Sequence, residues 1–210
     1  MRAKQNGIVV WGNGTPRTMR VYWALHELKL EYRSKPLKPR TADMDGTEFL
    51  AVSPGKKIPG FQHDELTLTE SGAIVFHLYQ RFAEAGFINA DFAKISRWSF
   101  FALMELDATA LYVMRRHRDL PQIYGDAPAA ISSCAEYFQR QAEVINDELS
   151  DGREFVVGRS LTPADIFIVS CCDWAIAYDL PLPDILAGYH ARLQQRSAYI
   201  EATKVNASML

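Results

Sequence analysis

The sequence contains few cysteines, and their spacing does not suit a disulfide framework. Only Cys134, Cys171 and Cys172 occur among the 210 residues, and two of them are adjacent. All three lie in stretches with a helical pattern, unlike the regularly spaced cysteines of small secreted domains. We therefore expect reduced thiols in a cytoplasmic protein.

Long apolar runs are also missing. Residues 8–11, near the N-terminus, form a run that is too short for a signal peptide, and no uncharged stretch of transmembrane length follows. The sequence thus predicts neither a secreted nor a membrane-spanning protein.

The chain has no excess of one charge. The formal net charge is −2, and no block of Lys or Arg indicates a nucleic-acid surface. The five histidines are scattered without the spacing of a metal site. The sequence GNGTPRT, residues 12–18, lacks the ending of a phosphate-binding loop. We predict no metal and no nucleic acid, and we expect a small-molecule partner.

The N-terminal part alternates predicted strands and helices. Residues 8–11 read as a buried strand, and Pro16 suits the first turn of the helix that follows. A strand over 31–36, a short helix over 43–51 and a hairpin over 59–68 come next. Thr69 is expected to cap a further helix, over 70–84. This order is that of a thioredoxin-like layer.

After residues 85–90 the strand patterns end. Helices are predicted over 91–120, 128–149, 163–178 and 181–196, while 203–210 are expected to fray. The third helix is apolar almost all round and must be buried. We predict an α/β thioredoxin-like domain (1–84), a linker (85–90) and an all-α helical domain (91–210).

One stretch, residues 56–74, predicts a ligand site. Pro59 cannot donate a ladder hydrogen bond and belongs at a strand start or sheet edge, which leaves the backbone of Ile58 free for strand addition. The helix start at Glu70 and Ser71 offers N–H groups and a positive dipole end to a carboxylate. A peptide-like acidic ligand fits both features. An ordinary hairpin and a capped helix would explain the same residues without a ligand.

The combination of KIPGF, a hairpin and TESGAI resembles the N-terminal domain of the cytosolic glutathione transferases, with the loop of the bacterial-type Thr or Ser members. The resemblance extends over nearly the whole chain. It implies a cis Pro59 and a glutathione site in which Ile58 binds the cysteinyl backbone. It further implies that Glu70 and Ser71 bind the γ-glutamyl end and that Lys57 lies near the glycyl carboxylate.

A transferase must lower the pKa of a thiol that starts at about 8.5. A helix dipole contributes about 0.3 to 2 kcal/mol, and a hydrogen bond to a charged group about 1.5 to 3 kcal/mol. A thiolate at the start of the first helix would be stabilised both by the helix dipole and by a hydrogen bond from a hydroxyl located there. From the resemblance, Thr15 is the first candidate for contact with the thiol, and Asn13 and Thr18 are the next candidates. A helix cap without a catalytic role is the alternative for Thr15.

The loop departs from the family in containing no Tyr, Ser or Cys. Arg17 stands where the cysteine-bearing classes have their nucleophile, which argues against a mixed disulfide with a protein thiol. The resemblance implies a glutathione transferase, an enzyme that uses glutathione as co-substrate and conjugates its thiolate to a small hydrophobic electrophile, and a homodimer. The alternatives are a glutathione-dependent disulfide or peroxide reductase and a non-catalytic glutathione-binding protein.

The helical part offers further candidates. Phe101, Met104 and Tyr112 are pocket candidates on the helix over 91–120, with a place in the core as their alternative. Glu105 or Asp107 would reach the ammonium of glutathione, or would be a solvated or capped carboxylate.

The sequence Thr-Pro-Ala-Asp, ending at Asp165, has the spacing of a capping box at the start of the apolar helix. We therefore predict a structural role for Asp165.

Overall fold

The computed structural model describes residues 7–83 and 91–208. The chain divides into two compact units. One comprises Met1–Ala90 together with Gln194–Leu210, and the other comprises Asp91–Leu193. The predicted linker over 85–90 lies outside the described residues, and each unit is described by itself.

The N-terminal unit contains a four-stranded sheet in the order β2-β1-β3-β4. β1 (Val9–Trp11) pairs in parallel with β2 (Arg33–Lys35) and antiparallel with β3 (Gly60–His63). β3 and β4 (Leu66–Leu68) form the predicted hairpin. The parallel pair is joined through α1 (Pro16–Glu27), as a parallel connection requires.

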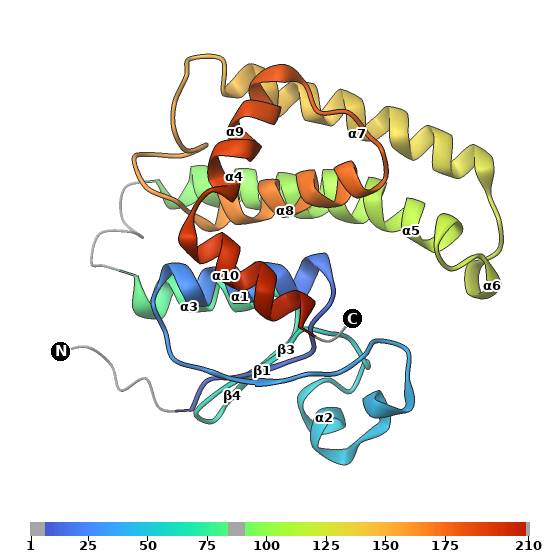
Figure 1. Cartoon of the computed structure of the whole chain (residues 1–210), viewed down its shortest axis with the longest axis vertical. Coiled ribbons are helices and arrows are strands. Elements are labelled where there is room, and N and C mark those ends of the chain that lie inside the picture. The colour runs from blue at the N-terminus through green and yellow to red at the C-terminus, as the bar shows by residue number, and fades with distance from the viewer. Residues whose placement is uncertain (1–6, 84–90, 209–210) are drawn as a thin grey trace. The chain divides into compact units, whose positions relative to one another are not determined.

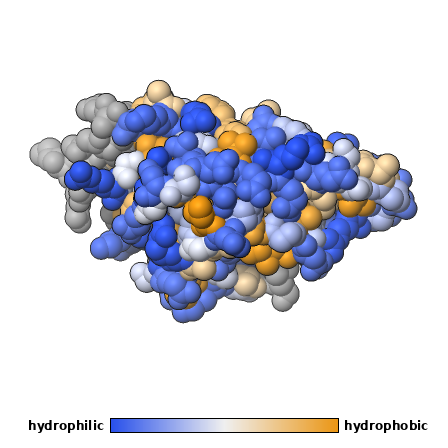
Figure 2. All heavy atoms as spheres, turned by 90° about the horizontal axis from the view of Figure 1, so that it is seen from above, coloured by the Kyte–Doolittle hydropathy of each residue, from blue (hydrophilic) through white to orange (hydrophobic). Residues whose placement is uncertain are grey.

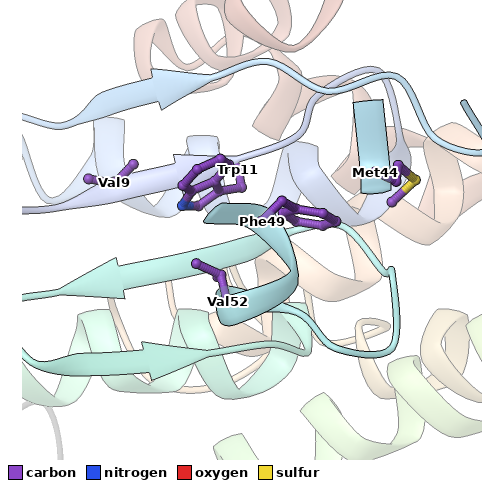
Figure 3. Close-up of a cluster of buried hydrophobic side chains, with 5 residues drawn as sticks. All are labelled: Val9, Trp11, Met44, Phe49 and Val52. Carbon is purple, nitrogen blue, oxygen red and sulfur yellow. The ribbon is translucent and has the colours of Figure 1, made fainter. Parts of the chain in front are cut away.

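Alternation along β1 gives the sheet two buried faces. Val10 is fully buried on one face, whereas its neighbours on β1 belong to a cluster on the other face (Figure 3). That cluster covers the sheet with η1 (Ala42–Asp45) and α2 (Thr47–Val52). Its buried members are Val9, Trp11, Met44, Phe49 and Val52.

The opposite face is covered by α1 and α3 (Ser71–Phe82), which pack against each other (Figure 1). Apolar residues of α1, including Val21 and Leu25, are fully buried in this layer. The sheet therefore lies between α2 on one side and the α1 and α3 pair on the other.

The start of α3 differs from the prediction. Glu70, rather than Thr69, is the N-cap residue, and α3 begins at Ser71. Glu70 has a φ of +65°, a left-handed backbone conformation. The prediction was wrong by one residue because Thr is a common N-cap and a left-handed Glu cannot be recognised from its side chain.

The expected fraying of 203–210 is also wrong over most of that segment. α10 (Ser197–Ala207) is a helix that lies along α1 in the N-terminal unit (Figure 1). Its order comes from side-chain contacts with α1, which is distant in sequence, so its own residues do not indicate it.

The helical unit begins with a long helical run. α4 (Phe92–Phe101) continues through the π-helical η2 (Ala102–Leu111) into α5 (Tyr112–Arg118). The predicted extent is close, but the wider π turns change which side chains share a face. Asp107 is 2% exposed whereas Met104 is 54% exposed, although residues three apart in a regular α-helix share a face.

Helices make up the rest of this unit. α6 (Pro121–Tyr124) and α7 (Pro128–Glu148) precede α8 (Pro163–Ala177), which is followed by α9 (Asp184–Gln194). α8 is buried over most of its circumference, as its composition predicts. The cysteines are free thiols, and the two in α8 are fully buried.

The surface view in Figure 2 is mainly hydrophilic, with hydrophobic residues in scattered groups. Such scattered apolar exposure is normal for a folded protein. Among the described residues, no helix has both the length and the apolar character needed to cross a bilayer.

Candidate active site

A glycine brings the loop after β1 against Ile58. Gly12 has a φ of +91°, and a Cβ at this position would lie 2.5 Å from Cγ2 of Ile58. Both the backbone conformation and the available space exclude a side chain. The start of the loop therefore contacts the residue that precedes Pro59.

The peptide bond between Ile58 and Pro59 is cis, as the resemblance implies. β3 begins directly afterwards, at Gly60. No hydrogen bond joins the backbone of Ile58 to another described residue. Its N–H and C=O groups have the character of a sheet edge that can pair with an extended peptide.

Lys57 is positioned through its backbone by Ser53. The N–H of Lys57 donates to Oγ of Ser53 at 3.0 Å, and that hydroxyl donates to the carbonyl of Lys57 at 2.8 Å. The side chain of Lys57 is exposed. A cation thus stands beside the edge at Ile58, which suits a carboxylate, and the reciprocal pair with Ser53 was not foreseen.

A buried arginine lies beside the start of α3. Nη1 of Arg20 donates to Oγ of Ser71 at 3.4 Å, and Arg20 is only 1% exposed. The side chain of Glu70 is exposed and makes no capping hydrogen bond. The buried guanidinium adds to the positive potential of the helix N-terminus. Sequence reasoning missed Arg20, because a buried arginine looks like a surface one in the sequence.

Thr15 and Thr18 form a capping box at the start of α1. The N–H of Thr18 donates to Oγ1 of Thr15 at 3.1 Å, and the N–H of Thr15 donates to Oγ1 of Thr18 at 3.0 Å. The two hydroxyls are 3.0 Å apart, and both residues are buried. The cap interpretation of Thr15 is therefore correct as far as the helix is concerned.

The first turn of α1 supplies no acidic residue that would offset the helix dipole. This helix is fully described, and its first turn includes Arg17. Both hydroxyls of the box are neutral at physiological pH. The N-terminus of α1 therefore keeps its positive end available for an anion.

Asn206, at the end of α10, contacts the same loop. Its Oδ1 accepts from Oγ1 of Thr18 at 2.6 Å, and its Nδ2 donates to the carbonyl of Thr15 at 3.1 Å. The candidate Asn13 lies in the loop and is 4% exposed. Sequence reasoning placed Asn206 in a frayed tail and gave it no role.

The described residues contain no group of three or more His, Cys, Asp or Glu side chains arranged to hold a metal ion. His63 and His77 form a pair, with Nδ1 of the first 3.1 Å from Nε2 of the second. Burial lowers the pKa of His77, and the nearby His63 and Arg81 lower it further. His77 thus favours its neutral form.

Comparison with known proteins identifies the N-terminal unit. Residues 7–80 match the family model of the glutathione S-transferase N-terminal domain. A glutathione S-transferase-like protein, gedE of Aspergillus terreus, is 36% identical over 101 residues, which is 45% of this chain and 44% of that protein. The match thus spans less than half of that relative. Residues 7–80 thus form an N-terminal domain of the glutathione S-transferase type.

Solved structures of glutathione transferases have the same fold as this chain. One from Phanerochaete chrysosporium, in complex with oxidized glutathione, gives a TM-score of 0.81 at 21% identity and 96% coverage of both chains. A family member from Pseudomonas fluorescens, with two glutathione bound, gives 0.79 at 23% identity, covering 95% of this chain and 93% of that one. The fold is a thioredoxin-like layer with an all-helical part.

The candidate residues of the helical unit have different environments. Phe101 and Tyr112 are half-buried, whereas Met104 is exposed. The hydroxyl of Tyr137 donates to Glu105, and Asp107 is buried. The predicted pocket role of the first three residues stays a prediction, as does contact of either carboxylate with glutathione.

Asp165 closes a capping box at the start of α8. Its Oδ2 accepts from the N–H of Thr162 at 2.7 Å and from Oγ1 of Thr162 at 2.9 Å. Its Oδ1 accepts from the N–H of Val156 at 2.8 Å and from the hydroxyl of Tyr189 at 2.6 Å. Burial raises the pKa of Asp165, and these hydrogen bonds oppose that rise. The capping contact predicted from the sequence is present.

Proposed function

We propose that the protein binds glutathione as an extra strand beside Ile58 and Pro59. The unpaired backbone of Ile58 supports pairing with the cysteinyl backbone. The N-terminus of α3, at Glu70 and Ser71, then receives the γ-glutamyl carboxylate, and Lys57 lies near the glycyl carboxylate. Gly12 places the loop that leads to Thr15 against the side chain of Ile58.

We further propose that Thr15 stabilises the thiolate of bound glutathione. The thiol releases its proton to solvent, and Oγ1 of Thr15 donates a hydrogen bond to the resulting sulfur anion. Lowering the thiol pKa by about two units requires roughly 2.7 kcal/mol. The helix dipole contributes about 0.3 to 2 kcal/mol and the hydrogen bond about 1.5 to 3 kcal/mol, so the two together suffice.

The observation that carries this function is the neutral N-terminus of α1. Its cap consists of Thr15 and Thr18, and its first turn contains Arg17 but no carboxylate. An anion placed there meets a positive helix end whose own first turn supplies no carboxylate. A helix cap needs only the hydrogen bonds of Thr15 and Thr18. The lack of a carboxylate in the first turn is a separate feature, and it supports thiolate binding.

The proposed reaction is conjugation, with glutathione as co-substrate. The thiolate attacks a soft electrophilic carbon, a carbon–sulfur bond forms, and the bond to the leaving group breaks with its electron pair. With chlorodinitrobenzene the leaving group is chloride. We place the electrophile beside Phe101, Met104 and Tyr112 and propose a cytoplasmic homodimer.

The test is a glutathione titration of the wild type, Thr15→Ala and Thr15→Ser, read by the ultraviolet absorbance of the thiolate. We expect Thr15→Ala to raise the pKa of the bound thiol by about one to two units, because a hydrogen bond to a charged group is lost. Thr15→Ser keeps the hydroxyl and should keep the low pKa. Full thiolate formation and full conjugating activity in Thr15→Ala would remove Thr15 from the mechanism.

A second candidate is a glutathione-dependent disulfide reductase. It is favoured by the ligands of the two similar structures, oxidized glutathione in one and two glutathione in the other. Two molecules of glutathione would reduce one disulfide to two thiols and become one glutathione disulfide. Parallel assays of chlorodinitrobenzene conjugation and hydroxyethyl disulfide reduction separate the candidates. Glutathione binding without thiolate formation would indicate a non-catalytic binding protein.

A further inference from the structure

α10 is joined to α1 along its whole length (Figure 1). The two helices are antiparallel, so the end of α10 lies at the start of α1. Four side-chain pairs join them, from the end of α1 to its start: Glu27 with Arg196, Trp23 with Tyr199, Met19 with Thr203, and Thr18 with Asn206. The last of these pairs lies at the proposed thiolate site.

The side chain of Asn206 contacts three residues around the start of α1. Its Oδ1 accepts from the N–H of Gly14 at 3.0 Å and from Oγ1 of Thr18 at 2.6 Å. Its Nδ2 donates to the carbonyl of Thr15 at 3.1 Å. The backbone carbonyl of Asn206 also accepts from the N–H of Gly14, at 2.9 Å. One residue thus fixes both sides of Thr15.

These contacts determine which way the hydroxyl protons point. A hydroxyl has a single proton to donate, and that of Thr18 has acceptors in Asn206 Oδ1 at 2.6 Å and the Thr15 carbonyl at 2.8 Å. The proton of Thr18 is therefore directed away from the hydroxyl of Thr15. Oγ1 of Thr15 accepts from the N–H of Thr18, and Thr15 becomes the donor in its 3.0 Å contact with Oγ1 of Thr18. The same proton can be donated to an anion when one is bound.

We propose that Asn206 is a positioning residue for thiol activation, an inference that rests on the proposed function. It holds the loop and takes the proton of Thr18, which leaves Thr15 as a hydrogen-bond donor to the sulfur of glutathione. Without Asn206, the hydroxyl of Thr18 turns to other acceptors, including Oγ1 of Thr15, and the loop loses its anchor at Gly14.

The experiment compares the wild type, Asn206→Ala and a control on the same helix, Thr203→Ala. Thr203 is exposed and lies outside the proposed site. Thiolate absorbance of bound glutathione, measured against pH, gives the thiol pKa. The Kd of S-methylglutathione reports tripeptide binding alone, because this probe has no thiol to ionise.

We expect Asn206→Ala to raise the thiol pKa by about one unit, a tenfold loss of thiolate at a given pH below it, while the Kd of S-methylglutathione stays within about twofold. Thr203→Ala should match the wild type in both. Asn206→Gln keeps the amide but displaces it by one methylene, so its pKa should lie between those of the wild type and Asn206→Ala. This milder variant also serves if Asn206→Ala does not fold.

An unchanged thiol pKa in both Asn206 variants would overturn the inference and leave the proposed function standing. A loss of S-methylglutathione binding as large as the loss of thiolate would also overturn it, because that result indicates a merely structural role. A wild type that binds S-methylglutathione but forms no thiolate would overturn the proposed function and this inference together.

Discussion

Helices α1 and α8 begin with nearly the same four residues, and the difference lies in the last of them. α1 starts with Thr-Pro-Arg-Thr and α8 with Thr-Pro-Ala-Asp. In both, the threonine is the N-cap, the proline occupies the first turn and the fourth residue closes a capping box. The closing residue is the neutral Thr18 in α1 and the acidic Asp165 in α8.

This single difference decides whether a carboxylate of the helix's own capping box lies at its positive end. Asp165 is fully buried and accepts four hydrogen bonds, so a carboxylate of the protein meets the positive end of α8. The box of α1 contains only hydroxyls, and its helix end is left for an anion from outside. The same capping geometry thus supports structure in one unit and a candidate site in the other.

The largest effect should follow from breaking the box of α8. Asp165→Ala leaves buried donors on Thr162, Val156 and Tyr189 without their acceptor, and each unsatisfied group costs about 1 to 3 kcal/mol. We expect a loss of at least about 3 kcal/mol in the free energy of unfolding by urea. Asp165→Asn keeps one acceptor oxygen, so its free energy of unfolding should lie between those of the wild type and Asp165→Ala. A loss below about 1 kcal/mol for Asp165→Ala would contradict this role.

The reverse change gives α1 the charge that α8 already has. Thr15→Asp keeps a good N-cap, because Asp caps at least as well as Thr, but it sets a negative charge against the thiolate. The pKa of bound glutathione should rise toward that of a free thiol, about 8.5, with little change in unfolding free energy. Thr15→Asn, a neutral cap, is the control. Thiolate absorbance equal to that of the wild type in Thr15→Asp would argue against a thiolate at this helix end.

A smaller effect distinguishes the two N-cap threonines. Thr162→Ala and Thr15→Ala should each cost about 1 kcal/mol of stability, because each removes a capping hydroxyl. Only Thr15→Ala should change the thiol pKa of bound glutathione. Urea unfolding and thiolate absorbance on the same preparations provide the measurement. An unchanged unfolding midpoint in Thr162→Ala would count against its hydroxyl as a stabilising cap.

Local patterns in the sequence were sufficient for much of the fold. The β-favouring residues 8–11, the hairpin and the Thr-Pro-Ala-Asp box are each formed by neighbours in the chain, and all appear where predicted. Helix α8 was predictable as buried because it has no polar face. These features depend on propensity and periodicity, which a sequence displays directly.

The parts that were missed depend on contacts between distant residues or on backbone angles. Asn206 and Thr18 are 188 positions apart, and Arg20 and Ser71 are 51 apart. Nothing near Asn206 indicates that α10 will order against α1. The π-helical register of η2 and the left-handed Glu70 are backbone properties without a side-chain pattern. Local patterns therefore suggested the candidate ligand residues, which stay a prediction, but they did not indicate Arg20 or Asn206, which contact those residues from distant parts of the sequence.

The smallest expected effect checks that the box of α1 does not titrate. Its hydroxyls carry no charge near neutral pH, so acid sensitivity of this unit must come from other groups, and His77 is one. Because burial lowers the pKa of His77 below its ordinary value of 6.5, the folded state favours the neutral ring. The resulting stability is present above that value and is lost as the pH falls through the lower folded pKa.

His77→Gln should lose less stability than the wild type between about pH 7 and pH 5, in urea unfolding at each pH. Equal losses would show that His77 does not contribute, and Thr18→Val, which leaves His77 in place, should retain the acid sensitivity of the wild type.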